Sequence, residues 1–135
     1  MWLKHLSQYK DAGLLILRIG IGLMFIIHGQ PKLFGGLETW ETIGEKGMGS
    51  VGIQMAPAFW GFMAGFAEFG GGVFLILGFF FRPACFFLLM TMIVAATSHL
   101  AGGDGIKGAS HAIEAGVLFL SLILIGPGKY SVDGK

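Results

Sequence analysis

One carboxylate, Glu68, lies near the middle of an apolar run that extends from Trp60 to Phe81. A helix that spans a membrane needs roughly 20 apolar residues, so this run is long enough to place Glu68 within the hydrocarbon layer. A charge at the centre of a bilayer costs at least ~2.5 kcal/mol. Glu68 therefore requires a cationic partner, water or a proton, and other segments of the chain must supply it.

Arg18 is the matching cation, because it interrupts the first apolar run, residues 13–30. Counted from the same end of a helical bundle, Arg18 is about eleven residues deep and Glu68 about ten, or ~15 Å for a helix that rises 1.5 Å per residue. Opposite charges at one depth favour pairing across neighbouring helices, since each then neutralises the other. The sequence therefore predicts an ion pair between Arg18 and Glu68.

Histidines gather at the ends of the other apolar runs. His28 ends the first run, His99 ends the third, and His111 and Glu114 begin the fourth. Four spans that alternate in direction bring these ends to one face of the membrane. We therefore expect a polar pocket there, with Lys32 beside it, bounded by Arg18, His28, Glu68, His99, His111 and Glu114.

Four kinds of chemistry fit this cluster. The polar groups can satisfy one another and fix the packing of the helices. They can bind a small redox-active or aromatic molecule such as a quinone, because His, Gln and Lys side chains donate hydrogen bonds beside apolar walls. A metal or haem site is favoured less, because it depends on His111 and Glu114, a pair at a spacing that is frequent by chance. Proton or ion transfer through Arg18, Glu68 and Glu114 is the fourth interpretation.

The composition indicates an integral membrane protein. Of the 135 residues, 54% are hydrophobic and 13% are charged, with a mean hydropathy of +0.75, whereas a soluble domain usually has about 25% charged residues. A net charge of +1 gives no indication of a nucleic-acid partner, and one cysteine, Cys85, excludes an internal disulfide. Residues 1–135 are expected to form one all-α domain, a four-transmembrane-helix bundle with spans at 13–30, 58–81, 84–100 and 109–126.

The long connection between the first two spans, residues 34–57, contains several glycines that break a spanning helix. Leu37, Trp40 and Ile43 recur along it with glutamates between them, which predicts either a short helix in the membrane interface or an exposed loop. Lys and Arg are more numerous on the side of the two termini, as expected if both termini are cytoplasmic.

Three segments of the chain have distinctive residue patterns. The first is Leu17–Phe25 followed by His28–Gly36, the second is Glu68–Gly78, and the third is Gly126–Asp133. In this order, and with four spans, they resemble the DoxX family of small membrane proteins. The resemblance implies a bacterial-type inner (cytoplasmic) membrane location and functional positions at Arg18, His28, Lys32 and Glu68. Members of that family are linked to quinone reduction with sulfur compounds and to membrane oxidoreductase complexes in oxidative-stress defence.

The leading hypothesis is therefore a membrane component of a redox system, such as an oxidoreductase subunit, that handles a quinone-like small molecule. In it, Arg18, His28, Lys32 and His99 bind the ligand, while Glu68, His111 and Glu114 serve catalysis, His111 and Glu114 by transferring protons. The alternative is a structural or accessory subunit that docks a larger membrane complex through its small-residue faces, or a homo-oligomer in the lipid bilayer. A transporter is a third class, weakened by the small size and the lack of an internal repeat.

Overall fold

The computed structural model describes residues 2–134, and within that range the regular structure is entirely helical. Four helices are long and apolar enough to cross a membrane. They are α1 (Lys10–Leu33), α3 (Pro57–Leu77), α4 (Phe81–Ala101) and α5 (Gly105–Ile125). The predicted all-helical fold with four spans is therefore confirmed.

The helices begin and end a few residues away from the ranges that the sequence indicates. α1 continues through Pro31 to Leu33, because a proline near the end of a helix removes only one of its hydrogen bonds. Gly78, in the left-handed conformation, ends α3, so Phe81 begins α4 rather than ending the preceding span. A left-handed glycine is the common end of a helix, since it carries no Cβ.

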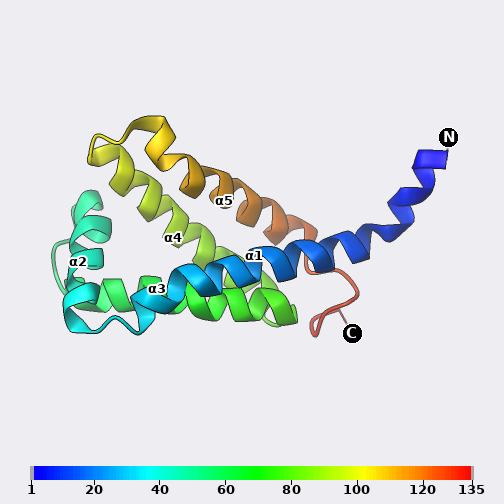
Figure 1. Cartoon of the computed structure of the whole chain (residues 1–135), viewed down its shortest axis with the longest axis horizontal. Helices are drawn as coiled ribbons and strands as arrows, with labels where there is room; N and C mark the ends of the chain where they lie inside the picture. Colours follow the sequence, from blue (N-terminus) through cyan, green and yellow to red (C-terminus); the bar gives the residue numbers. More distant parts are fainter. Residues whose placement is uncertain (1, 135) are drawn as a thin grey trace.

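The connection between α1 and α3 forms the short helix α2 (Leu37–Gly47), followed by a 3₁₀ turn, η2 (Met48–Val51). This agrees with the predicted short helix. α2 lies across one end of the bundle and packs against α3 (Figure 1). The indole Nε1 of Trp40 donates a hydrogen bond to the carbonyl oxygen of Lys32 over 2.9 Å. This bond ties α2 to the last turn of α1.

A 3₁₀ segment, η1 (Trp2–Tyr9), precedes α1 and extends beyond the bundle, at the end away from α2 (Figure 1). Both ends of the described chain lie on that side. We refer to it as the termini end, and to the opposite side as the α2 end.

Glycines let α1 and α3 pack at close range. A Cβ added at Gly22 would collide with the backbone oxygen of Gly72, and one added at Gly29 would collide with the backbone of Phe69. Small residues at helix interfaces allow this approach where no hydrophobic effect drives helices together. The buried face of α1 consists of the residues that the sequence places on one side: Arg18, Gly22, Phe25 and Gly29.

α4 and α5 form a second closely packed pair, and α3 joins the two pairs through its contact with α4. Within residues 2–134, the backbones of α1 and α5 do not come close together. Long side chains fill the space between them instead, with the rings of Phe25 and Phe119 edge to face at a centroid distance of 5.1 Å. Toward the α2 end the two pairs diverge (Figure 1).

Candidate functional site

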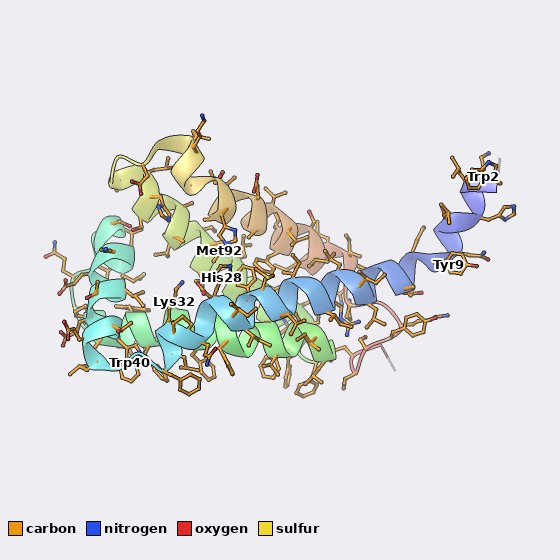
Figure 2. The ribbon with its side chains drawn as sticks, in the orientation of Figure 1. Trp2, Tyr9, His28, Lys32, Trp40 and Met92 are labelled. Carbon is orange, nitrogen blue, oxygen red and sulfur yellow. The ribbon has the colours of Figure 1, made fainter. Side chains whose placement is uncertain are left out.

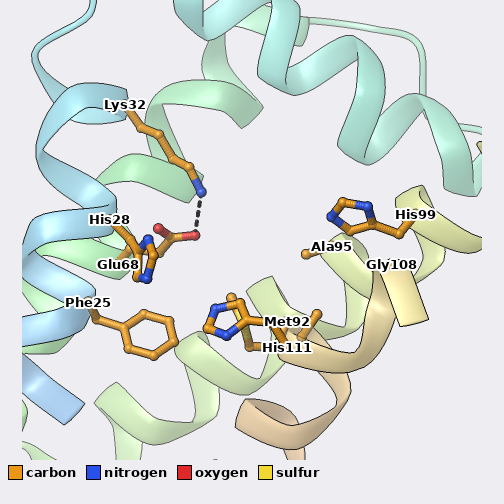
Figure 3. Close-up of a pocket in the computed structure, with 10 residues that line it drawn as sticks. Phe25, His28, Lys32, Glu68, Met92, Ala95, His99, Gly108 and His111 are labelled. Atoms are coloured by element: carbon orange, nitrogen blue, oxygen red, sulfur yellow. Dashed lines mark hydrogen bonds and ion pairs between the residues drawn. The ribbon is translucent and has the colours of Figure 1, made fainter. Parts of the chain in front are cut away.

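A partly buried ion pair joins α1 and α3 beside the space between the two helix pairs. The Nζ atom of Lys32 is 2.7 Å from Oε1 of Glu68 (Figure 3). Glu68 is only 3% exposed, and it lies about 16 Å along α3 from Pro57 at 1.5 Å per residue. The pair is positioned by glycines, since Gly29 of α1 lies against Glu68 and Gly65 of α3 lies against Lys32.

The second carboxylate oxygen of Glu68, Oε2, is buried and has no hydrogen-bond partner among the described residues. Buried polar atoms in folded proteins almost always have a partner, which is either protein or ordered water. Oε2 is therefore a buried acceptor for which the described residues provide no donor.

Glu68 and Lys32 line a cavity of about 140 Å³ at the α2 end. His28 and Lys32 from α1 and Met92 from α4 project into the space between the helix pairs (Figure 2). The two charged side chains of the wall come from α1 and α3. α4 and α5 each contribute one histidine among small or apolar residues. The full lining comprises Phe25, His28, Lys32, Glu68, Met92, Ala95, His99, Gly108, His111 and Ala112.

Two histidines and a phenylalanine form a ring cluster at this cavity. The rings of His28 and His111 have centroids 5.3 Å apart, and Phe25 is stacked on His111 at 6.2 Å. His28 and Phe25 come from α1, whereas His111 comes from α5. Side chains therefore bridge α1 and α5 where the backbones do not, and the rings of Phe25 and His111 lie near parallel, at an interplanar angle of 20° (Figure 3).

His99, from the last turn of α4, completes the set of histidines in the pocket wall. Its Nδ1 lies 2.8 Å from Oδ2 of Asp104, a residue that the sequence analysis did not single out. The signal for Asp104 was its position five residues after His99, at the turn where α4 ends and α5 begins. A carboxylate on one ring nitrogen fixes the orientation and the tautomer of a histidine.

The predicted pair between Arg18 and Glu68 is wrong. Arg18 is 1% exposed, but it lies toward the termini end and does not line the cavity. The prediction took both residues to be equally far from the α2 end, whereas Gly29, near the end of α1, is the residue that lies against Glu68. Arg18 is eleven residues, or about three helical turns, farther along α1. Lys32, at the end of α1, is the residue that reaches Glu68.

Arg18 is satisfied by main-chain carbonyl groups instead of a carboxylate. Its Nε donates to Leu75 O over 2.9 Å and one terminal nitrogen donates to Ile76 O over 2.8 Å. The other terminal nitrogen donates to Pro127 O and Tyr130 O. Because the first two carbonyls belong to the last turn of α3, the cation also complements the negative end of that helix.

The Gly126–Asp133 pattern belongs to the same structure at the termini end. The carboxylate of Asp133 accepts hydrogen bonds from the backbone N–H groups of Phe80 and Phe81, where α4 begins. The backbone N–H of Val132 donates to Leu77 O, and that of Asp133 donates to Gly78 O. The pattern therefore holds the tail across the ends of α3 and α4, far from the cavity.

Glu114 is exposed and is not part of the cavity lining. The structure thus brings together five of the predicted site residues, and it leaves Arg18 and Glu114 outside them. Within residues 2–134, no group of three or more His, Cys, Asp or Glu side chains has the arrangement of a metal site. The five residues that meet are His28, Lys32, Glu68, His99 and His111.

Four apolar helices, with an ion pair and a cavity buried between them, define a multi-pass α-helical membrane protein. The family model for DoxX matches residues 13–101, and the chain belongs to the DoxX family. The match covers α1 to α4, so four of the five clustered residues fall within it and His111 falls beyond it.

Proteins related to this chain extend over nearly its whole length. The inner membrane protein YphA of Escherichia coli is 34% identical over 143 residues, which cover 95% of this chain and 97% of YphA. A protein of Haemophilus influenzae is 32% identical over 139 residues, with 98% and 97% covered. The inner membrane protein YqjF of E. coli is 29% identical over 133 residues, with 95% of both chains covered. No solved structure matches. The chain is a multi-pass inner-membrane protein.

Proposed function

We propose that the protein is a membrane component of a redox system and that it binds a quinone-like molecule in the cavity at the α2 end. The observation that carries this proposal is the Glu68 carboxylate. It is 3% exposed, paired through one oxygen with Lys32, and unpartnered at the other oxygen. Perturbed or paired ionisable groups in a cavity beside apolar walls are typical of binding sites.

The size of the cavity supports a ligand with one ring. An apolar cavity of about 150 Å³ in another protein binds benzene, and the cavity here measures about 140 Å³. The stacked rings of Phe25 and His111 provide a flat wall for an aromatic or quinonoid ring. Offset and edge-to-face contacts between such rings contribute about 0.5–1.5 kcal/mol beyond burial alone.

The polar residues would hold the oxygen atoms of the ring. Lys32 and His28 are donors on the α1 side of the cavity, and His111 lies across from them on α5. A bound quinone supplies reversible uptake of two electrons and two protons. The chain's own contribution would be to orient the ring, to exclude lipid and water from it, and to hold protons at His111 and Glu68. Glu114, one turn beyond His111 on α5, stays a proposed proton carrier.

The alternative, an accessory subunit that docks a larger complex through its small-residue faces, has less support. Those faces are occupied within the chain, because Gly22 and Gly29 of α1 lie against α3, and Gly65 and Gly72 of α3 lie against α1. A partner could not use these surfaces without separating the two helices.

The test is to purify the protein from bacterial inner membranes in a mild detergent and to analyse the extract for quinones by mass spectrometry. In parallel, a quinone with a decyl tail is added and the melting temperature is measured. We expect a co-purified quinone and a rise of a few degrees, since a ligand at 100 times its Kd stabilises a protein by about 2.7 kcal/mol.

Two variants and a matched control make the test specific. Glu68→Gln and His111→Ala should abolish the rise in melting temperature. Glu41→Gln makes the same chemical change on the exposed surface of α2, and it should leave the rise intact. Absence of quinone from the extract, together with an unchanged melting temperature, would overturn the proposed function.

A further inference from the structure

We propose that η1 is an interfacial anchor that binds a membrane surface containing anionic phospholipids at the termini end. Its apolar side chains enter the membrane interface, and its lysines contact the phosphate groups of the lipids. η1 lies at the opposite end of the molecule from the cavity, so this inference does not depend on the proposed function. It is carried by the separation of apolar and cationic residues along η1.

The residues of η1 separate into rows because a 3₁₀ helix has three residues per turn, so that residues three apart lie above one another. One row is apolar and consists of Leu3, Leu6 and Tyr9, each more than half exposed. A second row contains Lys4 and leads to Lys10, the first residue of α1. An amphipathic segment with cations on its polar side is typical of helices that lie in the plane of a membrane interface.

The protein itself leaves η1 uncovered. None of its residues is buried, and among the helices of the described chain only α1 contacts it. A short helical segment without packing contacts is not stable in water, and 3₁₀ runs longer than about four residues are uncommon. The eight residues of η1 therefore need an apolar surface to order them.

The length of α1 places η1 at the membrane surface. The continuous helical segment Trp2–Leu33 has 32 residues, whereas a span needs roughly 20. α1 alone has 24 residues and is about 36 Å long, which already exceeds the hydrocarbon core of ~30 Å. η1 also turns away from the axis of α1 (Figure 1). Its first and last residues, Trp2 and Tyr9 (Figure 2), are of the two types that favour the level of the lipid headgroups.

Positive charge is in excess at the termini end. The exposed cations of the described residues there are Lys4, Lys10, Arg82 and Lys129. The carboxylates there, Asp11 and Asp133, accept hydrogen bonds from backbone N–H groups. Neither carboxylate forms an ion pair within residues 2–134. The lysines can therefore contact lipid phosphates, and each lysine near an anionic leaflet favours contact by about fivefold.

The experiment locates Trp2 relative to the lipid. The full-length protein is labelled with 5-fluorotryptophan, and the ¹⁹F resonance of Trp2 is assigned by its loss in Trp2→Phe. The protein is reconstituted in nanodiscs of phosphatidylcholine alone or mixed with an equal amount of phosphatidylglycerol. In the mixed nanodiscs, a lipid spin-labelled near the headgroup end of its acyl chain should broaden the Trp2 resonance. A neutral, water-soluble gadolinium chelate should leave it sharp.

Lys4→Gln combined with Lys10→Gln tests the role of the lysines. Replacing both should shift the equilibrium of η1 toward the free form by more than about tenfold. The chelate should then broaden the Trp2 resonance, as it should for the wild type in phosphatidylcholine alone. Lys46→Gln combined with Lys107→Gln removes the same charge from exposed positions at the α2 end, and this control should leave Trp2 protected.

Two results would overturn the inference. Broadening of Trp2 by the chelate and not by the labelled lipid, in the mixed nanodiscs, would show that η1 stays in water and would favour a protein partner for its apolar row. Equal protection of Trp2 with and without phosphatidylglycerol would show that the lysines select no anionic lipid. The comparison of the two lipid mixtures uses the wild-type protein, so it decides the question without the variants.

Discussion

The two ends of the bundle each bury a charged side chain, and they satisfy it in different ways. At the termini end, the guanidinium of Arg18 donates to the carbonyl groups of Leu75, Ile76, Pro127 and Tyr130. At the α2 end, the carboxylate of Glu68 has one side-chain partner and one oxygen without a partner. The guanidinium uses four of its five N–H groups on carbonyls of the chain, whereas the carboxylate keeps one oxygen for which the described residues provide no donor.

This difference separates a structural charge from a candidate functional one. A buried charge that main-chain carbonyls surround, such as Arg18, contributes to the packing of the fold. Glu68 lines a cavity and keeps one oxygen without a donor among the described residues, and a partly satisfied buried polar group is costly. Variants at the two ends should therefore affect different properties of the protein.

The largest effect is expected from Arg18→Met. The substitution removes four hydrogen bonds, and only Leu75 O keeps another donor, the backbone N–H of Gly78. We therefore expect a loss of at least about 3 kcal/mol in the free energy of unfolding. Arg18→Lys should not restore the lost stability. A lysine ammonium group cannot contact the carbonyls of α3 and those of Pro127 and Tyr130 at the same time, as the planar guanidinium does. The measurement is unfolding in a denaturing detergent, followed by circular dichroism.

Arg82→Met is the control for Arg18→Met. Arg82 is exposed and makes one hydrogen bond, to Ile123 O, at the same end of the bundle. Its loss should have a much smaller effect. If Arg18→Met unfolds at the same detergent concentration as wild type, the structural role assigned to the termini end is wrong.

The next largest effect is expected from Gly29→Val. The new side chain would collide with the backbone of Phe69 and with Glu68, and overpacking of this kind costs about 1–3 kcal/mol. It should also separate Lys32 from Glu68 and reduce quinone binding. Gly20→Ala is the control, because a Cβ at Gly20 meets no atom within 4 Å. The two variants are compared by melting temperature and by titration with the decyl quinone.

Lys32→Met tests the comparison between the two ends of the bundle at the α2 end. We expect quinone binding to weaken by at least about tenfold, with a melting temperature that changes by only a few degrees. The reason is that the Lys32 side chain is partly exposed and makes one hydrogen bond, whereas Arg18 is buried and makes four. A variant that loses stability as severely as Arg18→Met would show that the Lys32 pair is mainly structural.

The smallest effect is expected from Asp104→Ala. Both members of the His99–Asp104 pair are about half exposed, and exposed ion pairs contribute less than about 1 kcal/mol. Stability should therefore remain close to that of wild type. The orientation of His99 should change, which is measured by the ¹⁵N chemical shifts of its ring. Unchanged shifts would indicate that Asp104 does not position His99.

The sequence predicted the fold well because its signals are local. Apolar runs long enough to span a bilayer predicted α1, α3, α4 and α5. The site was predicted less completely. Histidines at helix ends were assigned to one end of the bundle correctly, because alternating spans leave few other arrangements.

The pairing of the charges was not predictable in the same way. It depends on where each helix begins relative to its neighbour, and a shift of one turn changes which residues meet. The predicted first span ended at residue 30, so Lys32 was placed beside the pocket although it lies within α1. The role of the Gly126–Asp133 tail also required the structure, since its contacts join residues that are far apart in the chain.

By itself, the sequence determined that this protein crosses a membrane four times and that a carboxylate must be accommodated within the bundle. Both follow from the transfer free energies of apolar and charged groups, which depend on residue type and run length. Only the tertiary structure decided that Lys32 neutralises Glu68, that carbonyl groups hold Arg18, and that one oxygen of Glu68 remains free. Those outcomes depend on helix offsets and on the close approach that glycines allow between α1 and α3.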